Sequence, residues 1–95
     1  MFSLDEKGRI IKREDKIIPL TKNELIIINI LKDNQTHSDQ EILNFIYGEG
    51  NYYSRSNLSV LLYRVKSKTG LSVSRVRGFG YILIDKIKEE KTRRV

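Results

Sequence analysis

The sequence contains no cysteine and no long apolar run. Without cysteine there is neither a disulfide framework nor thiolate chemistry, which is consistent with a reducing cytosol. The longest apolar stretch, Leu25–Ile28, is far too short to cross a bilayer. Met1–Asp5 also lacks the basic start and the apolar run of a signal peptide. We therefore expect a cytoplasmic, soluble chain that makes no membrane contact of its own.

Acidic residues are missing from one long segment. Between Gly50 and Ile84 there is no Asp or Glu, but these 35 residues hold six basic ones: Arg55, Arg64, Lys66, Lys68, Arg75 and Arg77. Residues 1–54 carry 7 basic and 9 acidic side chains, so the net charge of +6 comes from the second half. A cationic surface without acids of its own predicts an external anion. Phosphate is the usual candidate, because its binding releases counterions.

Clusters of catalytic or metal-binding residues are scarce as well. The spacing shows no metal-ligand cluster and no nucleophile–base pair, and Gly78-x-Gly80 follows no strand-to-helix junction, unlike a dinucleotide fingerprint. His37 is the only histidine and precedes a helix cap, so we expect it to be a solvated loop residue. The sequence therefore predicts no enzyme activity, no cofactor and no metal site.

The 95 residues suffice for one domain with a single small core. Short β-branched segments within residues 2–18 are separated by Gly and Asp clusters, which predicts an antiparallel meander of two or three strands. Pro19 has no amide proton to donate, so the third strand should end there.

Capping signals predict two helices after the meander. Thr21 and Glu24 have the spacing of a capping box, in which each side chain satisfies an amide at the helix start, and Asp33-Asn34 would end that helix. Ser38 repeats the same spacing at the second helix, and Gly48 offers a C-terminal cap.

A third helix would start at a Ser54 cap and end near Gly70. One of its sides is apolar and should be buried, with Leu58, Leu61, Leu62 and Val65. The other side carries small, polar and basic residues: Ser59, Val60, Tyr63, Arg64 and Ser67. Such an outer face, behind two capped helices, indicates a helix-turn-helix whose last helix could enter a major groove.

Two strands should follow, Leu71–Val76 and Tyr81–Ile84, joined by a Gly-Phe-Gly turn with Tyr81 in the core. An arginine at such a hairpin tip, Arg77, suits the narrow and electronegative minor groove. Lys86–Val95 is charged and nearly without apolar residues, as in a frayed tail. The predicted division is a folded domain at residues 1–84 and a charged tail or linker at residues 85–95.

Three motifs, in order and spacing, resemble the OmpR/PhoB-type winged-helix DNA-binding domain: Leu20-Thr-x-x-Glu24-Leu25, Arg64-Val-Lys66-x-Lys68 and Val76-Arg-Gly-Phe-Gly-Tyr81. The resemblance covers residues 2–84. It implies an α+β winged helix-turn-helix with an N-terminal antiparallel sheet, three helices and a C-terminal β-hairpin wing. It also implies a bacterial transcription regulator that binds double-stranded DNA, with helix 55–69 in the major groove and wing 73–84 in the minor groove.

Matched position by position, the resemblance implies base reading by Asn57, Ser59, Val60, Tyr63 and Arg64. It places a phosphate contact on Lys66 and the minor-groove arginine on Arg77, and we add Arg55, Lys68 and Arg75 as further DNA contacts. The chain departs from the family at Thr69, which replaces an aliphatic residue, and at Tyr63, where many members carry Arg or Ser. The family often has an Arg near Ser56, whereas the nearest one here is Arg55. The operator sequence is therefore not transferable.

One such module makes few base contacts, so we expect a homodimer on direct repeats or a partner regulator. The loop Gly48–Tyr53 stands where the family contacts RNA polymerase, which makes the polymerase a further candidate partner, although this loop is short. We expect no receiver domain ahead of the module. This N-terminal placement is similar to the ToxR/CadC-type regulators and predicts the cytoplasmic domain of a membrane-anchored regulator.

Two alternatives remain open at this point. A winged helix can also be a protein-interaction module, whose basic face here would dock an acidic partner. Residues 77–82 also nearly match the RNA-binding RNP1 pattern, whose aromatic residues stack on bases. That fold requires another helix and strand after the motif, and only 11 residues follow Ile84.

Overall fold

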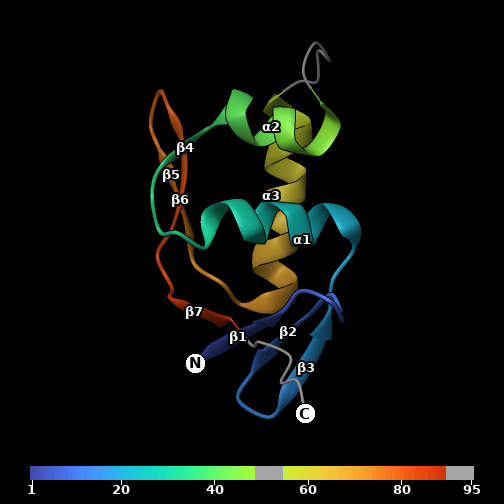
Figure 1. Ribbon diagram of the computed structural model, residues 1–95. Coiled ribbons are helices and arrows are strands. Elements are labelled where there is room, and N and C mark those ends of the chain that lie inside the picture. The colour runs from blue at the N-terminus through green and yellow to red at the C-terminus, as the bar shows by residue number, and fades with distance from the viewer. Residues whose placement is uncertain (49–54, 90–95) are drawn as a thin grey trace.

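The computed structural model describes residues 1–48 and 55–89, without the side chains of Arg55 and Ser56 (Figure 1). Its elements are β1 (Phe2–Asp5), β2 (Ile10–Arg13), β3 (Lys16–Pro19), α1 (Lys22–Leu31), β4 (His37–Ser38), α2 (Asp39–Tyr47), α3 (Arg55–Thr69), β5 (Val73–Val76), β6 (Gly80–Leu83) and β7 (Ile87–Glu89). The predicted Ser54 cap and the loop Glu49–Tyr53 lie outside the described residues.

The first three strands form the predicted antiparallel meander, and β3 ends at Pro19 as expected. A fourth strand completes this sheet in the order β3-β2-β1-β7, because β7 pairs in parallel with β1. This corrects part of the predicted tail, since residues 87–89 belong to the sheet. The free edge of β1 provides the hydrogen-bonding partner, and Ile87 packs against the core. The division between domain and tail otherwise stays a prediction.

The first helix begins as its capping signal predicts. The Thr21 amide donates to Glu24 Oε1 at 2.8 Å, and the Glu24 amide donates to Thr21 Oγ1 at 3.2 Å. The helix ends at Leu31 with Lys32 as its cap, slightly before the predicted stop. Asn34 then takes a positive φ of 61°, and its side-chain Nδ2 donates to the carbonyls of Leu83 and Asp85.

Only half of the second capping box is present. Ser38 Oγ accepts from the Glu41 amide at 3.1 Å, but the Glu41 carboxylate binds His37 and does not return to the Ser38 backbone. At the other end, Gly48 is the predicted cap, with a φ of 86° that favours glycine.

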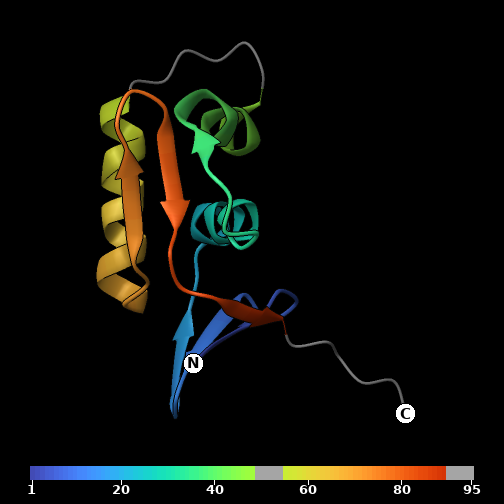
Figure 2. The ribbon, with the colours of Figure 1, turned by 90° about the vertical axis from the view of Figure 1, so that its left-hand side faces the viewer.

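The core lies where α3, α1, the N-terminal sheet and the hairpin meet. From α3 it takes Leu58, Leu62 and Val65, as the apolar stripe predicted, with Leu61 partly buried. Thr69 is also buried: its hydroxyl donates to the Val65 carbonyl and accepts from the Leu71 amide, so this polar substitute for an aliphatic residue is satisfied. Figure 2 shows α3 running beside the β5–β6 hairpin, with the N-terminal sheet at one end of both.

The hairpin is held against the helices by the short strand β4. The second sheet has the order β4-β6-β5, in which Ser38 lies opposite Gly80 and His37 opposite Tyr81. A Cβ on Gly80 would lie 1.9 Å from the His37 carbonyl oxygen, so only glycine allows this approach. The Asp39 amide adds a 3.3 Å hydrogen bond to the Phe79 carbonyl.

We expect Gly80→Ala to destabilise the domain by about 3 kcal/mol, because its methyl group would collide with fixed backbone and separate β6 from β4. Gly78→Ala is the matched control two residues away. Unlike Gly80, Gly78 has a positive φ, of 75°, but a Cβ there would meet no atom within 4 Å, so backbone strain alone should cost about 1 kcal/mol. Urea unfolding followed by circular dichroism measures both losses, and equal losses would contradict the steric argument.

Candidate nucleic-acid interface

The face of α3 opposite its buried stripe is exposed along its described length. The exposed side chains are Asn57, Ser59, Val60, Tyr63, Arg64, Lys66, Ser67 and Lys68. Tyr63 and Val60 are 69% and 49% exposed, although both are large and apolar. The prediction that Tyr63 points away from the body is therefore confirmed. Tyr81 has the opposite environment: it is buried, so it cannot stack on a base as an RNP1 aromatic residue does.

The hairpin and α3 share a groove of about 120 Å³. Its walls are Ser59, Leu62, Tyr63 and Lys66 from α3 and Val73, Arg75 and Tyr81 from the hairpin. Ser59 Oγ lies 3.3 Å from the Tyr81 hydroxyl across the groove. A wider hollow of about 410 Å³, which also reaches Ser67 and Ser72, shares Tyr63, Lys66 and Val73 with it. The exposed face of α3 and the wing are therefore continuous along this groove.

Arg64 and Arg77 are not among the residues that line this groove. Arg64 follows Ser59 by five residues, so its position is about 140° further round the helix. It remains exposed, on the part of α3 that faces away from the groove. Arg77 follows the end of β5 and is exposed in the hairpin turn. The side chain of Arg55 lies outside the description.

Two of the six cations of the acid-free segment are paired with carboxylates from the first half of the chain. Lys68 Nζ lies 2.9 Å from Glu24 Oε1, and Arg75 Nη2 lies 3.5 Å from Asp39 Oδ2. The inference that this segment meets no internal anion is therefore wrong for these two, because folding brings in acids that are distant in sequence. Arg64, Lys66 and Arg77 have no carboxylate partner among residues 1–48 and 55–89.

The two ion pairs also affect protonation. Burial of Glu24 opposes its ionisation, but the Thr21 amide and Lys68 together hold the pKa of this carboxyl below its ordinary value. The pKa of Arg75 is raised as well. Tyr81 is the larger cause and Asp39 the smaller one. Glu24 and Arg75 thus remain charged in the folded domain at neutral pH.

No protein-family model matches the sequence, and no curated protein matches it. Solved structures do match. The DNA-binding domain of Bacillus subtilis CssR is 24% identical, with a TM-score of 0.81 over 88% of this chain and 100% of that one. The C-terminal domain of the nisin resistance regulator NsrR is 25% identical, with a TM-score of 0.69 over 86% of this chain and 89% of that one.

A third match, the DNA-binding domain of the response regulator AdeR, was solved in complex with an intercistronic region. It is 19% identical, with a TM-score of 0.73 over 86% of this chain and 92% of that one. This chain has the winged-helix fold of these DNA-binding domains and is similar to the OmpR/PhoB type. The predicted α+β architecture is confirmed, whereas the ToxR/CadC-like placement stays a prediction. No helix in the described part of the winged-helix domain is long and apolar enough to cross a membrane.

His37 is not the solvated loop residue that the sequence predicts. Its pairing with β6 draws it into the winged-helix domain, where Nε2 lies 2.9 Å from Asp33 Oδ1 and Nδ1 lies 2.8 Å from Glu41 Oε2. Burial lowers its pKa, but the bonds and charges of the two carboxylates outweigh this and raise the pKa of His37. The acids stand four residues before and four after His37, a spacing visible in the sequence.

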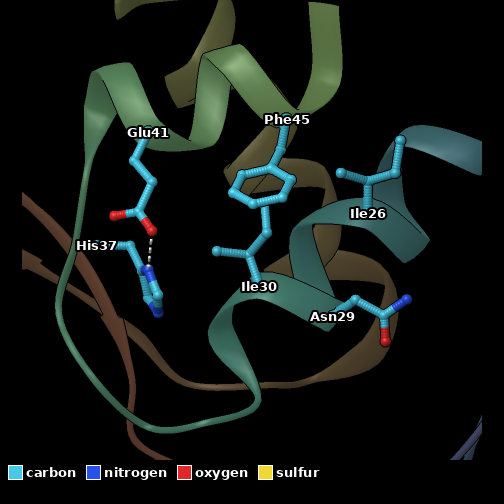
Figure 3. A pocket seen from close by; sticks show the side chains of 6 residues that line it. All are labelled: Ile26, Asn29, Ile30, His37, Glu41 and Phe45. Carbon is cyan, nitrogen blue, oxygen red and sulfur yellow. Dashed lines mark hydrogen bonds and ion pairs between the residues drawn. The ribbon is translucent and has the colours of Figure 1, made fainter. Parts of the chain in front are cut away.

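An apolar hollow of about 380 Å³ lies next to His37, between α1 and α2 (Figure 3). Ile26, Asn29 and Ile30 line it from α1, and Glu41 and Phe45 from α2. Few polar groups line the hollow, and two of them, His37 and Glu41, are hydrogen-bonded to each other. Within the described residues of the winged-helix domain, no group of three or more His, Cys, Asp or Glu side chains could hold a metal ion.

The stability of the domain should depend on pH through His37. Because Asp33 and Glu41 favour its protonated form in the fold, the contribution of His37 is complete below its ordinary pKa of about 6.5. It should disappear as the pH rises through the raised folded value. The loss should be about 1 kcal/mol at most, since both carboxylates are partly exposed. The measurement is urea unfolding of wild type and His37→Gln from about pH 5.5 to about 9. A pH-independent difference between the two proteins would exclude this role.

Proposed function

We propose that this chain binds double-stranded DNA in a sequence-specific manner, as the DNA-binding domain of a bacterial transcription regulator. The observation that carries the proposal is the exposed polar face of α3, which adjoins the wing and carries Arg64 and Lys66, two cations with no carboxylate partner among the described residues. One α-helix fits one major groove. The likeness to the AdeR domain, which was solved with DNA, supports this choice of partner.

The proposed role of each residue follows from its position on α3 or on the wing. With α3 in the major groove, Asn57, Ser59, Val60, Tyr63 and Arg64 would read base edges, and Lys66 would bind phosphate. With the wing in the minor groove, Arg77 would enter it. Arg55, Lys68 and Arg75 complete the predicted set. Of these three, Lys68 and Arg75 are already held by carboxylates, which makes them weaker candidates for phosphate contact than Lys66.

A single copy would make too few base contacts for high specificity, so two copies on direct repeats, or a partner regulator, belong to the proposal. RNA polymerase contact through residues 48–53 is a separate hypothesis, because most of that loop lies outside the described residues.

The competing function is a protein-interaction module that docks an acidic partner on the same cations. Affinity for several duplexes at a series of salt concentrations separates the two. DNA binding predicts preference for one duplex and a log–log slope that steepens by about 0.9 for each phosphate contact. Equal and weak affinity for every duplex would favour the acidic protein partner.

Arg64→Ala should weaken binding by about 1–3 kcal/mol and relax specificity at one base pair, if the guanidinium bonds guanine in a bidentate manner. Lys16→Ala is the control, since Lys16 is an exposed cation on β3 of the N-terminal sheet. A selection from randomised duplexes shows whether one position loses its preference. An unchanged site preference in Arg64→Ala would reject base reading by this residue.

Arg77→Ala should weaken binding most where the flank of the site is rich in A·T pairs, because a narrow minor groove concentrates negative potential. The measurement compares wild type and variant on duplexes that share the major-groove site and differ only in the flank. The same loss on every flank would reduce Arg77 to a general phosphate contact.

A further inference from the structure

Arg75 is poorly placed for a phosphate contact. It lies directly opposite Tyr81 in the hairpin register, and its Cζ is 4.9 Å from the centroid of the Tyr81 ring. Its Nη2 donates to Asp39 Oδ2 at 3.5 Å, and that carboxylate is only 8% exposed. One guanidinium therefore covers an aromatic ring of β6 and bonds an acid at the N-terminus of α2.

Tyr81 extends this contact to α3. Its ring is buried under Arg75, and its hydroxyl lies 3.3 Å from Ser59 Oγ, on the helix proposed to enter the major groove. Asp39 holds the wing a second time, because its amide donates to the Phe79 carbonyl in the hairpin turn at 3.3 Å. Asp39, Arg75, Tyr81 and Ser59 thus connect α2, both strands of the wing and α3.

We propose that Asp39 and Arg75 are positioning residues that hold the wing at a set distance from α3, so that both can reach one DNA site. This inference rests on the proposed function and narrows it. Arg75 affects the position of α3 indirectly, because it covers the Tyr81 ring and Tyr81 contacts Ser59. Its guanidinium is paired with Asp39. A planar guanidinium can stack over a ring while its edge bonds a carboxylate, whereas the compact ammonium of lysine has no flat face to stack and is a poorer substitute.

Asp39→Asn is the decisive variant, because charge and position predict opposite results. It removes an acid from a domain that binds phosphate, so electrostatics alone predicts equal or tighter binding. Loss of positioning predicts weaker binding. The dissociation constant should rise about tenfold, which corresponds to a loss of about 1.4 kcal/mol of binding free energy. Glu14→Gln is the matched control: it removes one exposed acid from the turn between β2 and β3 and should not weaken binding.

Arg75 is then tested by the salt dependence. Arg75→Gln should weaken binding as much as Asp39→Asn does. Its log–log slope of affinity against salt concentration should equal that of the wild type. The double variant should bind no more weakly than either single variant. Arg75→Lys, which keeps the charge, should not restore binding. A phosphate contact predicts instead a slope smaller by about 0.9 in Arg75→Gln and near-normal binding by Arg75→Lys.

All variants are first compared with wild type by urea unfolding. If Asp39→Asn does not fold, Tyr81→Phe replaces it: this variant keeps the ring under Arg75 but loses the hydroxyl that contacts Ser59 and Arg75, and it should weaken binding without changing the slope. Asp39→Asn or Tyr81→Phe with wild-type affinity would overturn the positioning role while leaving DNA binding intact. A wild-type chain that binds no duplex would reject the proposed function itself.

Discussion

The wing can lie against the helices only because residue 80 has no side chain. The His37 carbonyl occupies the space that a Cβ would need, and this approach lets β4 pair with β6. Three other features depend on it. Tyr81 is buried with its hydroxyl near Ser59, His37 is drawn between two carboxylates, and the Asp39 amide reaches the hairpin turn. A loss of this one contact would therefore affect the groove between α3 and the wing.

The distribution of charge shows how folding selects among cations that look equivalent in the sequence. Acids from the first half neutralise Lys68 and Arg75, whereas Arg64, Lys66 and Arg77 meet no carboxylate in the described part of the chain. The Glu24 and Asp39 carboxylates are buried and require partners, so removal of Lys68 or Arg75 would leave an uncompensated charge between the helices and the hairpin. Within the described part of the acid-free segment, the cations that remain available are fewer than composition suggests, and they lie on the two elements proposed to contact DNA.

Local signals in the sequence predicted most of the fold. The Thr21–Glu24 capping box, the strand end at Pro19, the Gly48 cap and the apolar stripe of α3 each depend on neighbouring residues, so their physics is contained in short segments. The errors involve partners that are distant along the chain. β7 needs the edge of β1, and Lys68 and Arg75 need acids 44 and 36 residues away. The prediction for His37 was wrong because its side chain is held between Asp33 and Glu41 only once β4 pairs with β6.

The sequence by itself determined the order of the helices and of the strands other than β4 and β7, the face of α3 that is buried, and the excess of positive charge in the second half. Periodicity, caps and composition are local properties, and they need no knowledge of the rest of the chain. Only the tertiary structure decided which cations keep a free charge and how the wing is held beside α3. Both depend on contacts between segments far apart in sequence, because Coulomb attraction and steric fit act over distances in space.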